Sequence, residues 1–177
     1  MTTDPTAALF EDVRQVCASC RRPVLIPRHE LVLRERWTCY GCGRGNPYVP
    51  PQPKALSVRQ PWAELVARGD KTVEVRSWGT DYRGPLVICS AAAWHATGVR
   101  QHGELGARGV SVCVVDLVDV RPLTLRDGQA TLGYDPEGDV ERGLLGWVLA
   151  RPRRLPPIPV KGKLSLFAVP ADVAALI

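Results

Sequence analysis

Two pairs of cysteines have the spacing of a metal site. Two residues separate Cys17 from Cys20 and Cys39 from Cys42, and 18 residues lie between the pairs. Two intervening residues let a tight turn aim both thiolates at one tetrahedral ion, so this spacing is typical of structural zinc. Because four thiolates leave no open position, we predict a structural Zn²⁺ rather than a catalytic one. The alternative is a set of unliganded surface thiols.

The segment around these cysteines is predicted to form a zinc ribbon over residues 14–46. Residues 24–26 and 30–38 are expected to be its short strands. A segment this short buries too little apolar surface to fold alone, so metal binding would supply much of its folding free energy. Prolines crowd residues 47–53, which favours an extended linker. Such a ribbon can bind nucleic acid, bind a protein partner or brace its neighbour. Binding of nucleic acid is favoured if the arginines and the tryptophan of this segment are exposed, as cations and a stacking ring. These residues are Arg21, Arg22, Arg34, Arg36, Arg44 and Trp37.

Composition restricts the class of protein. The 177 residues carry 23 Lys and Arg against 18 Asp and Glu, a formal charge of +5, and 45% are hydrophobic. This composition is that of a folded chain rather than a disordered one. No apolar run approaches the roughly 18 residues that a membrane span needs. The first residues lack the features of a secretory signal, so we expect a cytoplasmic protein without a membrane partner, with reduced cysteines.

Residues 54–177 have the pattern of a second, larger domain. Residues 55–58, 72–76, 85–91, 110–120, 146–150 and 164–169 are predicted strands, and 60–69 and 92–102 are predicted helices. Pro61 suits the first turn of the earlier helix, and Gly69 suits its end. Cys89 and Cys113 fall in apolar strands and are expected in the core. We therefore predict a mainly β (α+β) chain, with a small barrel following the ribbon.

Three stretches of this domain resemble the ASCH domain family. They are Leu56-Ser57-Val58-Arg59-Gln60-Pro61-Trp62-Ala63, then Gly69-Asp70-Lys71-Thr72-Val73-Glu74-Val75-Arg76-Ser77-Trp78, then Tyr82-Arg83-Gly84-Pro85-Leu86. The end, Pro159 to Phe167, resembles the last strand of that family. The resemblance covers about residues 54–177 and leaves the ribbon out. It implies a PUA-like β-barrel with a cleft that takes RNA or nucleotide-like ligands.

The cleft residues are carried over from this resemblance. Glu74, Arg76 and Trp78 share one strand parity, so a carboxylate and a guanidinium about 7 Å apart would grip a base edge and a phosphate. Trp62 or Trp78 would supply a stacking plane. The alternative is a Glu74–Arg76 surface pair beside core tryptophans. The predicted nucleic-acid-binding residues are Arg59, Trp62, Lys71, Glu74, Arg76, Ser77, Trp78, Tyr82 and Arg83.

An enzymatic function stays open. Some members of the resembled family hydrolyse an acylated cytidine with a lysine and a threonine, and others are reported to cut RNA. Lys71 matches that lysine, but Glu74 occupies the position of the threonine. Lys71 and Glu74 are thus the candidate catalytic pair of a small hydrolase, either a metal-independent ribonuclease or an amidohydrolase acting on a modified nucleoside. We favour binding of RNA or single-stranded nucleic acid, with the hydrolase and a protein adaptor as alternatives.

Two basic clusters flank a proline-rich turn near the end of the chain. One is Arg151 to Arg154 and the other is Lys161 to Lys163. A cluster beside the cleft would extend the surface that binds phosphates. A cluster away from the cleft would be an ordinary solvated loop.

Overall fold

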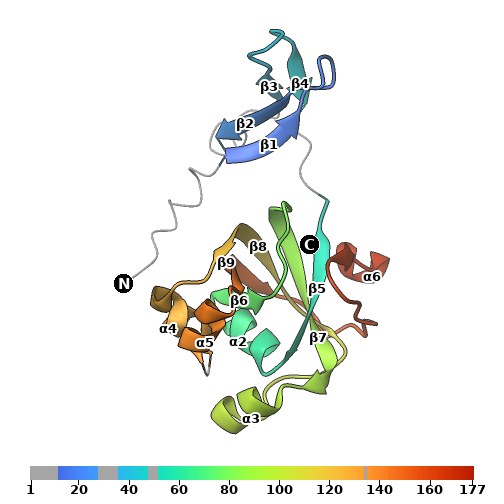
Figure 1. Cartoon of the computed structure of the whole chain (residues 1–177). Helices are drawn as coiled ribbons and strands as arrows, with labels where there is room; N and C mark the ends of the chain where they lie inside the picture. The colour runs from blue at the N-terminus through green and yellow to red at the C-terminus, as the bar shows by residue number, and fades with distance from the viewer. Residues whose placement is uncertain (1–11, 28–35, 48–51, 134) are drawn as a thin grey trace. The chain divides into compact units, whose positions relative to one another are not determined.

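The computed structural model describes residues 12–27, 36–47, 52–133 and 135–177. The first residues and part of the predicted strand at 30–38 therefore lie outside the described residues, as does Arg34. The chain divides into two compact units, Met1–Pro51 and Gln52–Ile177, and the division falls inside the proline-rich segment 47–53 (Figure 1).

The smaller unit consists of two short hairpins. β1 (Asp12–Val16) pairs antiparallel with β2 (Pro23–Pro27), and β3 (Arg36–Thr38) pairs antiparallel with β4 (Gly45–Pro47). Among its described residues, the core contains only Cys17, Val24, Ile26, Trp37 and Cys39. So small a core gives little hydrophobic stabilisation, which leaves the cysteines as the main link between the hairpins.

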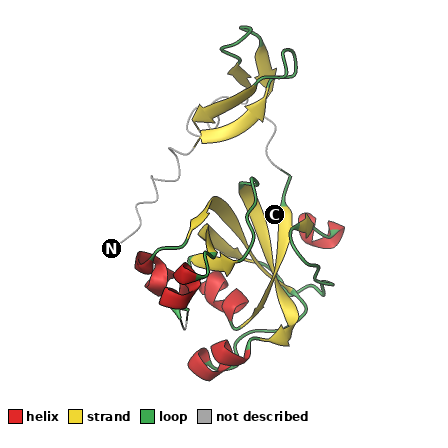
Figure 2. Cartoon of the chain, viewed as in Figure 1, coloured by secondary structure: helices red, strands yellow, loops and turns green. Residues whose placement is uncertain are grey.

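The larger unit is built on one mixed sheet with the strand order β10-β5-β7-β8-β9-β6. The strands are β5 (Lys54–Gln60), β6 (Val73–Arg76), β7 (Gly84–Trp94), β8 (Ser111–Pro122), β9 (Leu145–Arg154) and β10 (Phe167–Ala168). β5 and β7 run parallel, and the other neighbours are antiparallel. The prediction of a mainly β chain with a few short helices is confirmed (Figure 2).

Strand alternation gives the sheet two apolar faces. Leu56 and Ile88 belong to the cluster that includes α2 (Trp62–Arg68), whereas Ala55 and Val87 belong to the cluster on the other face. Successive side chains of a strand point to opposite faces, so adjacent residues enter different cores. α6 (Ala171–Ala174) contributes Val173 to the second cluster. Cys89 and Cys113 are fully buried, as predicted.

Short helices occupy the connections. α3 (Ala96–His102) follows β7, and η2 (Leu125–Asp127), α4 (Gly128–Thr131) and α5 (Pro136–Glu141) lie between β8 and β9. α2 ends at Gly69, whose φ of 82° is the left-handed conformation that glycine adopts without strain. The short helices between β8 and β9 were not predicted from the sequence, because each has too few residues to show a helical periodicity.

The predicted closed barrel is wrong. The sheet ends at β10 and β6, and these two edges do not pair with one another. β10 pairs only with Lys54 and Ala55, which leaves the rest of that edge of β5 without a strand partner in the described residues. Arg76 on β6 spans the opening instead, because its Nη2 donates to the Ser57 carbonyl of β5 at 2.8 Å. A side chain thus bridges the gap that backbone pairing would have closed.

Candidate functional site

A large cleft lies at the opening of the sheet. Its volume is about 1350 Å³, and all of its lining residues belong to the larger unit. β5 and β6 form two of its walls, and residues 161–165 before β10 form a third. Further lining residues come from segments 91–97 and 131–142, together with Trp62 and Gly109. The cleft therefore occupies the place at which the barrel fails to close.

The floor of the cleft is a buried row of three charges. Glu74 lies between two cations, with its Oε2 3.6 Å from Lys71 Nζ and its Oε1 3.1 Å from Arg76 Nη2. The side chains of Lys71 and Glu74 are 4% and 9% exposed. This arrangement leaves the floor with one net positive charge. It also differs from the expected 7 Å separation, because Arg76 turns back onto Glu74 instead of reaching an independent position.

Backbone carbonyls hold Lys71 in place. Its Nζ donates to the carbonyls of Val73 at 2.7 Å and Thr131 at 2.6 Å, and lies 5.4 Å from the centre of the Trp62 ring. Burial lowers the pKa of Lys71, and the charge of Glu74 opposes that shift. A carbonyl oxygen can only accept, so the Lys71 side chain donates to both of them. These contacts hold α4, through Thr131, close to Glu74.

Two polar atoms beside the floor have no hydrogen-bond partner among the described residues. They are Ser57 Oγ and Arg76 Nε, and both are buried. The segment before β10 passes directly over the first of them, since a Cβ on Gly162 would lie 2.5 Å from Ser57 Oγ. Gly162 therefore allows the chain carrying Lys161 and Lys163 to approach β5 closely.

The rim of the cleft is predominantly positive. Arg59, Lys161 and Lys163 line it, are exposed, and form no ion pair with another described residue. Arg142 also lines the cleft, but it is paired with Asp135 and Asp139. Three cations therefore remain available to an anionic ligand.

Trp62 is the aromatic wall of the cleft. His95 and His102 meet it edge-on, with ring centroids 5.5 and 5.3 Å away. Gly98 of α3 lies against the indole, because a Cβ there would be 3.0 Å from two of its ring carbons. Burial lowers the pKa of His95, and the nearby Arg59 adds to this effect. Both favour the neutral imidazole, whose Nδ1 accepts from Gly98 N and caps α3.

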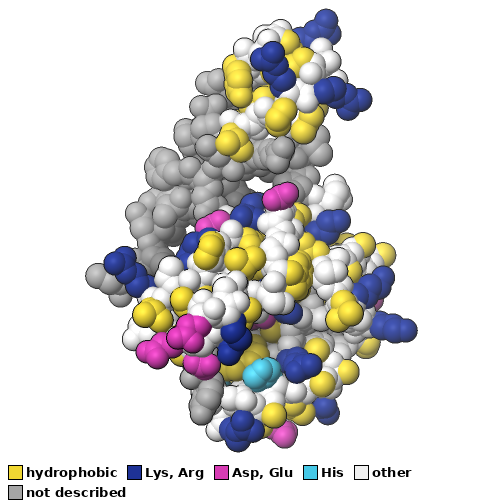
Figure 3. Space-filling model, viewed as in Figure 1, with side chains coloured by type: hydrophobic (Ala, Val, Ile, Leu, Met, Phe, Trp, Pro, Cys, Tyr) yellow, Lys and Arg dark blue, Asp and Glu magenta, His cyan; other side chains and the backbone are white. Residues whose placement is uncertain are grey.

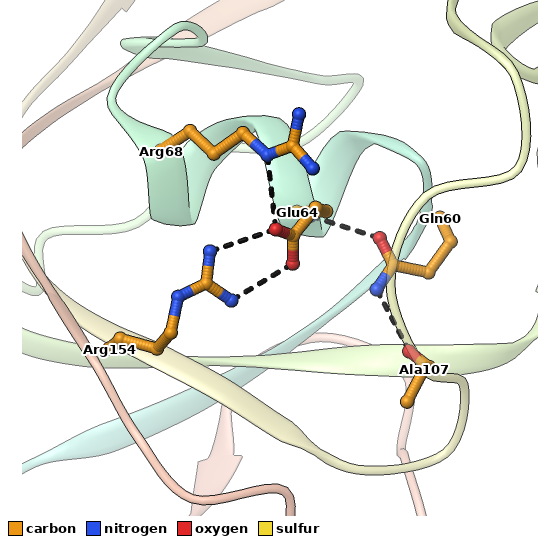
Figure 4. Close-up of polar contacts among 5 residues, drawn as sticks. All are labelled: Gln60, Glu64, Arg68, Ala107 and Arg154. Carbon is orange, nitrogen blue, oxygen red and sulfur yellow. Dashed lines mark hydrogen bonds and ion pairs between the residues drawn. The ribbon is translucent and has the colours of Figure 1, made fainter.

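A polar network around Glu64 fixes α2 (Figure 4). Glu64 accepts two hydrogen bonds from Arg154 at 2.8 and 3.0 Å and one from Arg68 at 3.1 Å. Gln60 accepts from the backbone N–H of Glu64 and donates to the Ala107 carbonyl. Arg154 comes from β9, 90 residues away. This network therefore ties the helix that carries Trp62 to a distant strand.

The four ribbon cysteines converge in the smaller unit. Their sulfur atoms all lie within 4.8 Å of one another, and the Cys17–Cys42 and Cys20–Cys39 pairs are 3.7 Å apart. Four thiolates about 2.3 Å from a tetrahedral ion would be about 3.8 Å apart, so the cluster fits such a site. The backbone N–H of Cys20 lowers the pKa of Cys17 to about 6, whereas the pKa of the neighbouring Cys42 is raised to about 11, because burial and the other thiols outweigh the Arg44 backbone hydrogen bond.

Both cysteine turns have the same backbone hydrogen bonds. Cys17 N donates to the Arg22 carbonyl at 2.9 Å, and Cys39 N donates to the Arg44 carbonyl at 2.9 Å. The residue after each pair, Arg21 or Gly43, has a positive φ of 59° or 69°. Each turn thus aims backbone and sulfur at one point, as a structural metal site requires.

Comparison with known proteins identifies the larger unit. The family model of the ASCH domain matches residues 56–155. The chain belongs to the ASCH domain family. The match begins after the cysteine unit, for which only the four converging sulfur atoms indicate a ribbon.

Solved structures agree on the fold of the ASCH domain. A crystal structure of an ASCH protein from Zymomonas mobilis aligns with a TM-score of 0.51 at 12% identity, over 70% of this chain and 92% of that one. Two point mutants of that protein align with the same TM-score at 14% and 13% identity, covering 71% and 72% of this chain and 95% and 96% of theirs. At such identities the likeness concerns the fold alone.

Two curated mammalian proteins share a short segment with this chain. Activating signal cointegrator 1 of Homo sapiens is 60% identical over 37 residues, which is 21% of this chain and 6% of that protein. Its Mus musculus counterpart is 57% identical over 35 residues, with 20% and 6% covered. This chain therefore spans only a small part of the length of these relatives.

The structure places the predicted cleft residues in two groups. Those that line the cleft are Arg59, Trp62, Lys71, Glu74, Arg76 and Trp78. Ser77, Tyr82 and Arg83 are not among the lining residues. Tyr82 donates to the Pro85 carbonyl, and Arg83 pairs with Asp119, so the ASCH domain uses both to hold its own strands.

The two basic clusters also separate. Lys161 and Lys163 line the cleft, whereas the segment from Arg151 to Arg154 does not. Arg151 pairs with Asp116 and Arg154 with Glu64, so these two guanidiniums serve the fold. Spacing alone does not distinguish the clusters, because the path of the chain over Ser57 decides which one meets the cleft.

Several lining residues were not predicted from the sequence. They are Ser57, His95, Thr97, Thr131, Asp135, Asp139, Arg142 and Ser165. Most lie in the segments between β7 and β8 or between β8 and β9, which only the tertiary fold brings to the cleft. For example, α4 contacts β6, and the N–H of Thr72, just before β6, donates to the Ala130 carbonyl.

One ribbon prediction is wrong. Trp37 was expected as an exposed stacking ring, but it is 6% exposed and belongs to the small core. The indole is the largest apolar side chain among the described residues of this unit, so the hydrophobic effect favours its burial. Tyr40, between Cys39 and Cys42, is instead 77% exposed. Within the described residues, no helix is long and apolar enough to span a membrane.

Proposed function

We propose that the cleft of the ASCH domain binds RNA through a single-stranded or splayed nucleotide. The observation that carries this proposal is the combination of three unpaired rim cations with an indole wall in one open cleft. Cations that follow phosphates and rings that stack on bases are the usual components of a single-strand site. The volume of about 1350 Å³ exceeds the roughly 300–1,000 Å³ of small-molecule pockets, which supports a ligand longer than one nucleotide.

The proposed roles follow from burial. Arg59, Lys161 and Lys163 are exposed and would contact phosphates, while Trp62 would lie against a base. Glu74 would accept an N–H from the edge of that base, because its carboxylate is held on the floor by Lys71 and Arg76. Lys71 and Arg76 would therefore act by positioning Glu74.

The contacts of Lys71 favour binding over hydrolysis. A general base must accept a proton, but Lys71 Nζ already donates to two carbonyls and lies beside Glu74. We therefore rank the hydrolase that would use Lys71 and Glu74 below the binder. Mass spectrometry of the RNA after incubation distinguishes the two functions. A hydrolase would form a product with the parent chain and none with Glu74→Gln, while Glu74→Gln would still bind the RNA.

A salt titration tests the binding proposal. The double variant Lys161→Ala/Lys163→Ala removes two phosphate contacts, so the slope of log affinity against log salt falls by about 1.4 for single-stranded RNA. Arg126→Ala/Arg153→Ala removes the same charge from exposed positions outside the cleft. Fluorescence anisotropy with a labelled oligonucleotide measures both slopes. Equal slopes for the two double variants would contradict a cleft-bound phosphate.

For the cysteine cluster we propose structural Zn²⁺, held by Cys17, Cys20, Cys39 and Cys42. The converging sulfur atoms support one tetrahedral ion, and thiolate ligands favour zinc among the available divalent ions. Elemental analysis of the purified chain should give one Zn²⁺ per chain and none in Cys39→Ser. Because such thiols must stay reduced, we place the protein in the cytoplasm.

A further inference from the structure

We propose that the cysteine unit carries a second binding surface for single-stranded nucleic acid, formed by Arg21, Arg22, Tyr40 and Arg44. We call these four residues the knuckle face. Nothing in the match to the ASCH domain includes them, because that match begins at residue 56. The proposal goes beyond the cleft and depends on different residues.

The repeated cysteine turn brings arginines to equivalent places. Arg22 and Arg44 occupy the same position in the two turns, and the carbonyl of each accepts from the first cysteine of its pair at 2.9 Å. All three arginines of the knuckle face are exposed, and none forms an ion pair with another described residue. Figure 3 shows basic side chains projecting from this unit. The metal site therefore fixes the backbone from which these guanidiniums extend.

Arg22 crosses from its own turn onto the other. A Cβ added to Gly41 would lie 2.9 Å from Arg22 Cδ and 3.2 Å from its Nη1. Gly41 directly follows Tyr40, so the arginine stem lies against the backbone beside the exposed ring. Only a residue without a side chain leaves room for this approach. A guanidinium and a phenol ring are thereby held on the same part of the surface.

The exposure of Tyr40 needs an explanation. Its side chain is 77% exposed, while the only other ring among the described residues of this unit, Trp37, is buried. An exposed ring between two metal ligands contributes nothing to the small core. Stacking on a base would cover it, and stacking is sequence-tolerant because every base has a π-face.

The charge of the unit also favours a polyanion. Residues 14–46 contain seven arginines and two glutamates, a formal net charge of +5. Four thiolates with a divalent ion carry −2, so this stretch keeps a net charge of +3 after metal binding. Guanidinium suits phosphate because its planar donors bind two oxygens together. Arginine with an exposed ring thus fits a nucleic-acid strand better than it fits an acidic protein surface, which supplies no base to stack.

Two linked surfaces should bind a long strand more tightly than either binds alone. The knuckle face and the cleft belong to one chain joined through residues 47–53, so occupying one raises the effective concentration at the other. An oligonucleotide of a few nucleotides is long enough to fill only one of the two surfaces. Length dependence therefore separates the two sites.

The experiment uses the full, zinc-loaded chain and labelled single-stranded RNA of about 4 and about 25 nucleotides, chosen to fill one site or both. Tyr40→Ala should weaken binding of the long RNA about tenfold, and Arg22→Ala/Arg44→Ala by at least as much. Neither should change the affinity for the short RNA. Gly41→Ala keeps the charge and the ring but displaces Arg22, so it should give a smaller loss for the long RNA. Arg36→Ala removes one exposed arginine that is not part of the knuckle face, and it is the control for loss of a single charge from this unit.

Folding is checked independently of binding. Each variant should retain one Zn²⁺ and the indole N–H resonance of Trp37. The proposal is overturned if Tyr40→Ala and Arg22→Ala/Arg44→Ala both bind the long RNA within twofold of the parent chain. It is also overturned if these variants lose only a nuclease-resistant protein complex, which would assign the face to a protein. Failure of the cleft looks different, because Lys161→Ala/Lys163→Ala would then leave the short RNA unaffected.

Discussion

The two units of this chain are organised over very different distances along the sequence. The cysteine unit is organised by local turns and by contacts between cysteine sulfur atoms whose residues are 19 and 25 positions apart in the sequence. In the ASCH domain the organising contacts join residues 60 and 90 positions apart, as between Lys71 and Thr131 and between Glu64 and Arg154. We propose that the first unit depends on a bound metal ion, whereas the second has a packed core. Their responses to perturbation should therefore separate cleanly.

Metal removal should give the largest effect. A chelator should unfold the cysteine unit completely and leave the ASCH domain intact, because the five core residues that the structure describes in this unit give too little burial to fold it. The Trp37 indole N–H resonance should lose its dispersion while that of Trp147 stays. Four thiols should then become reactive, but Cys89 and Cys113 should not, because burial raises their pKa values to about 11 and about 12. Simultaneous loss of both indole signals would contradict independent units.

Loss of the buried cation should be the largest single-residue effect in the ASCH domain. Lys71→Met leaves the Val73 and Thr131 carbonyls unpaired and removes one partner of Glu74. We expect the free energy of unfolding to fall by about 3 kcal/mol. Urea titration followed at Trp147 measures it, and the exposed Lys163→Met is the control. A loss below about 1 kcal/mol would mean that Lys71 does not position the floor.

Breaking the network around Glu64 should cost less. Arg154→Ala leaves Glu64 with Arg68, and because Arg154 is half exposed we expect a loss of about 2 kcal/mol at pH 7. The neighbouring exposed Arg153→Ala should change stability by less than about 0.5 kcal/mol. Equal losses in the two variants would contradict a role for the bidentate pair.

The same pair predicts a pH dependence. Arg154 holds the pKa of Glu64 below its ordinary value of 4.5. A lowered carboxyl pKa stabilises the folded state fully above 4.5, and this stabilisation is lost as the pH falls through the folded-state pKa. The difference in stability between the parent chain and Arg154→Ala should therefore shrink as the pH is lowered below 4.5. Urea titrations over that range measure it, and a constant difference would argue against the pair.

Tyr82 should give the smallest effect. Tyr82→Phe removes the hydrogen bond to the Pro85 carbonyl, whose oxygen lies 2.5 Å from the hydroxyl, and should cost about 1 kcal/mol of stability. Burial raises the pKa of this phenol to about 12, so the hydroxyl remains a donor at neutral pH. RNA affinity should not change, because Tyr82 does not line the cleft. A clear loss of affinity would place Tyr82 back in the ligand site.

The strands illustrate how far sequence patterns extend. The alternation in residues 72–76 and the apolar run in 85–91 correspond to β6 and β7, because strand periodicity is a local property. The predicted strand at 164–169 is reduced to Phe167 and Ala168, since β10 pairs only with the first two residues of β5. Pairing partners decide where a strand ends, and no local pattern contains them.

The cysteine cluster and the floor of the cleft mark the two limits of prediction. Spacing by itself determined that Cys17, Cys20, Cys39 and Cys42 converge, because two residues between ligands fix a turn whatever surrounds it. Only the tertiary structure decided that Arg76 turns onto Glu74 and bridges to Ser57 across an open sheet. It also decided that Trp37 is buried and Tyr40 exposed. Local turns are encoded within a few residues, whereas burial and long-range pairing depend on which distant segments compete for the same core.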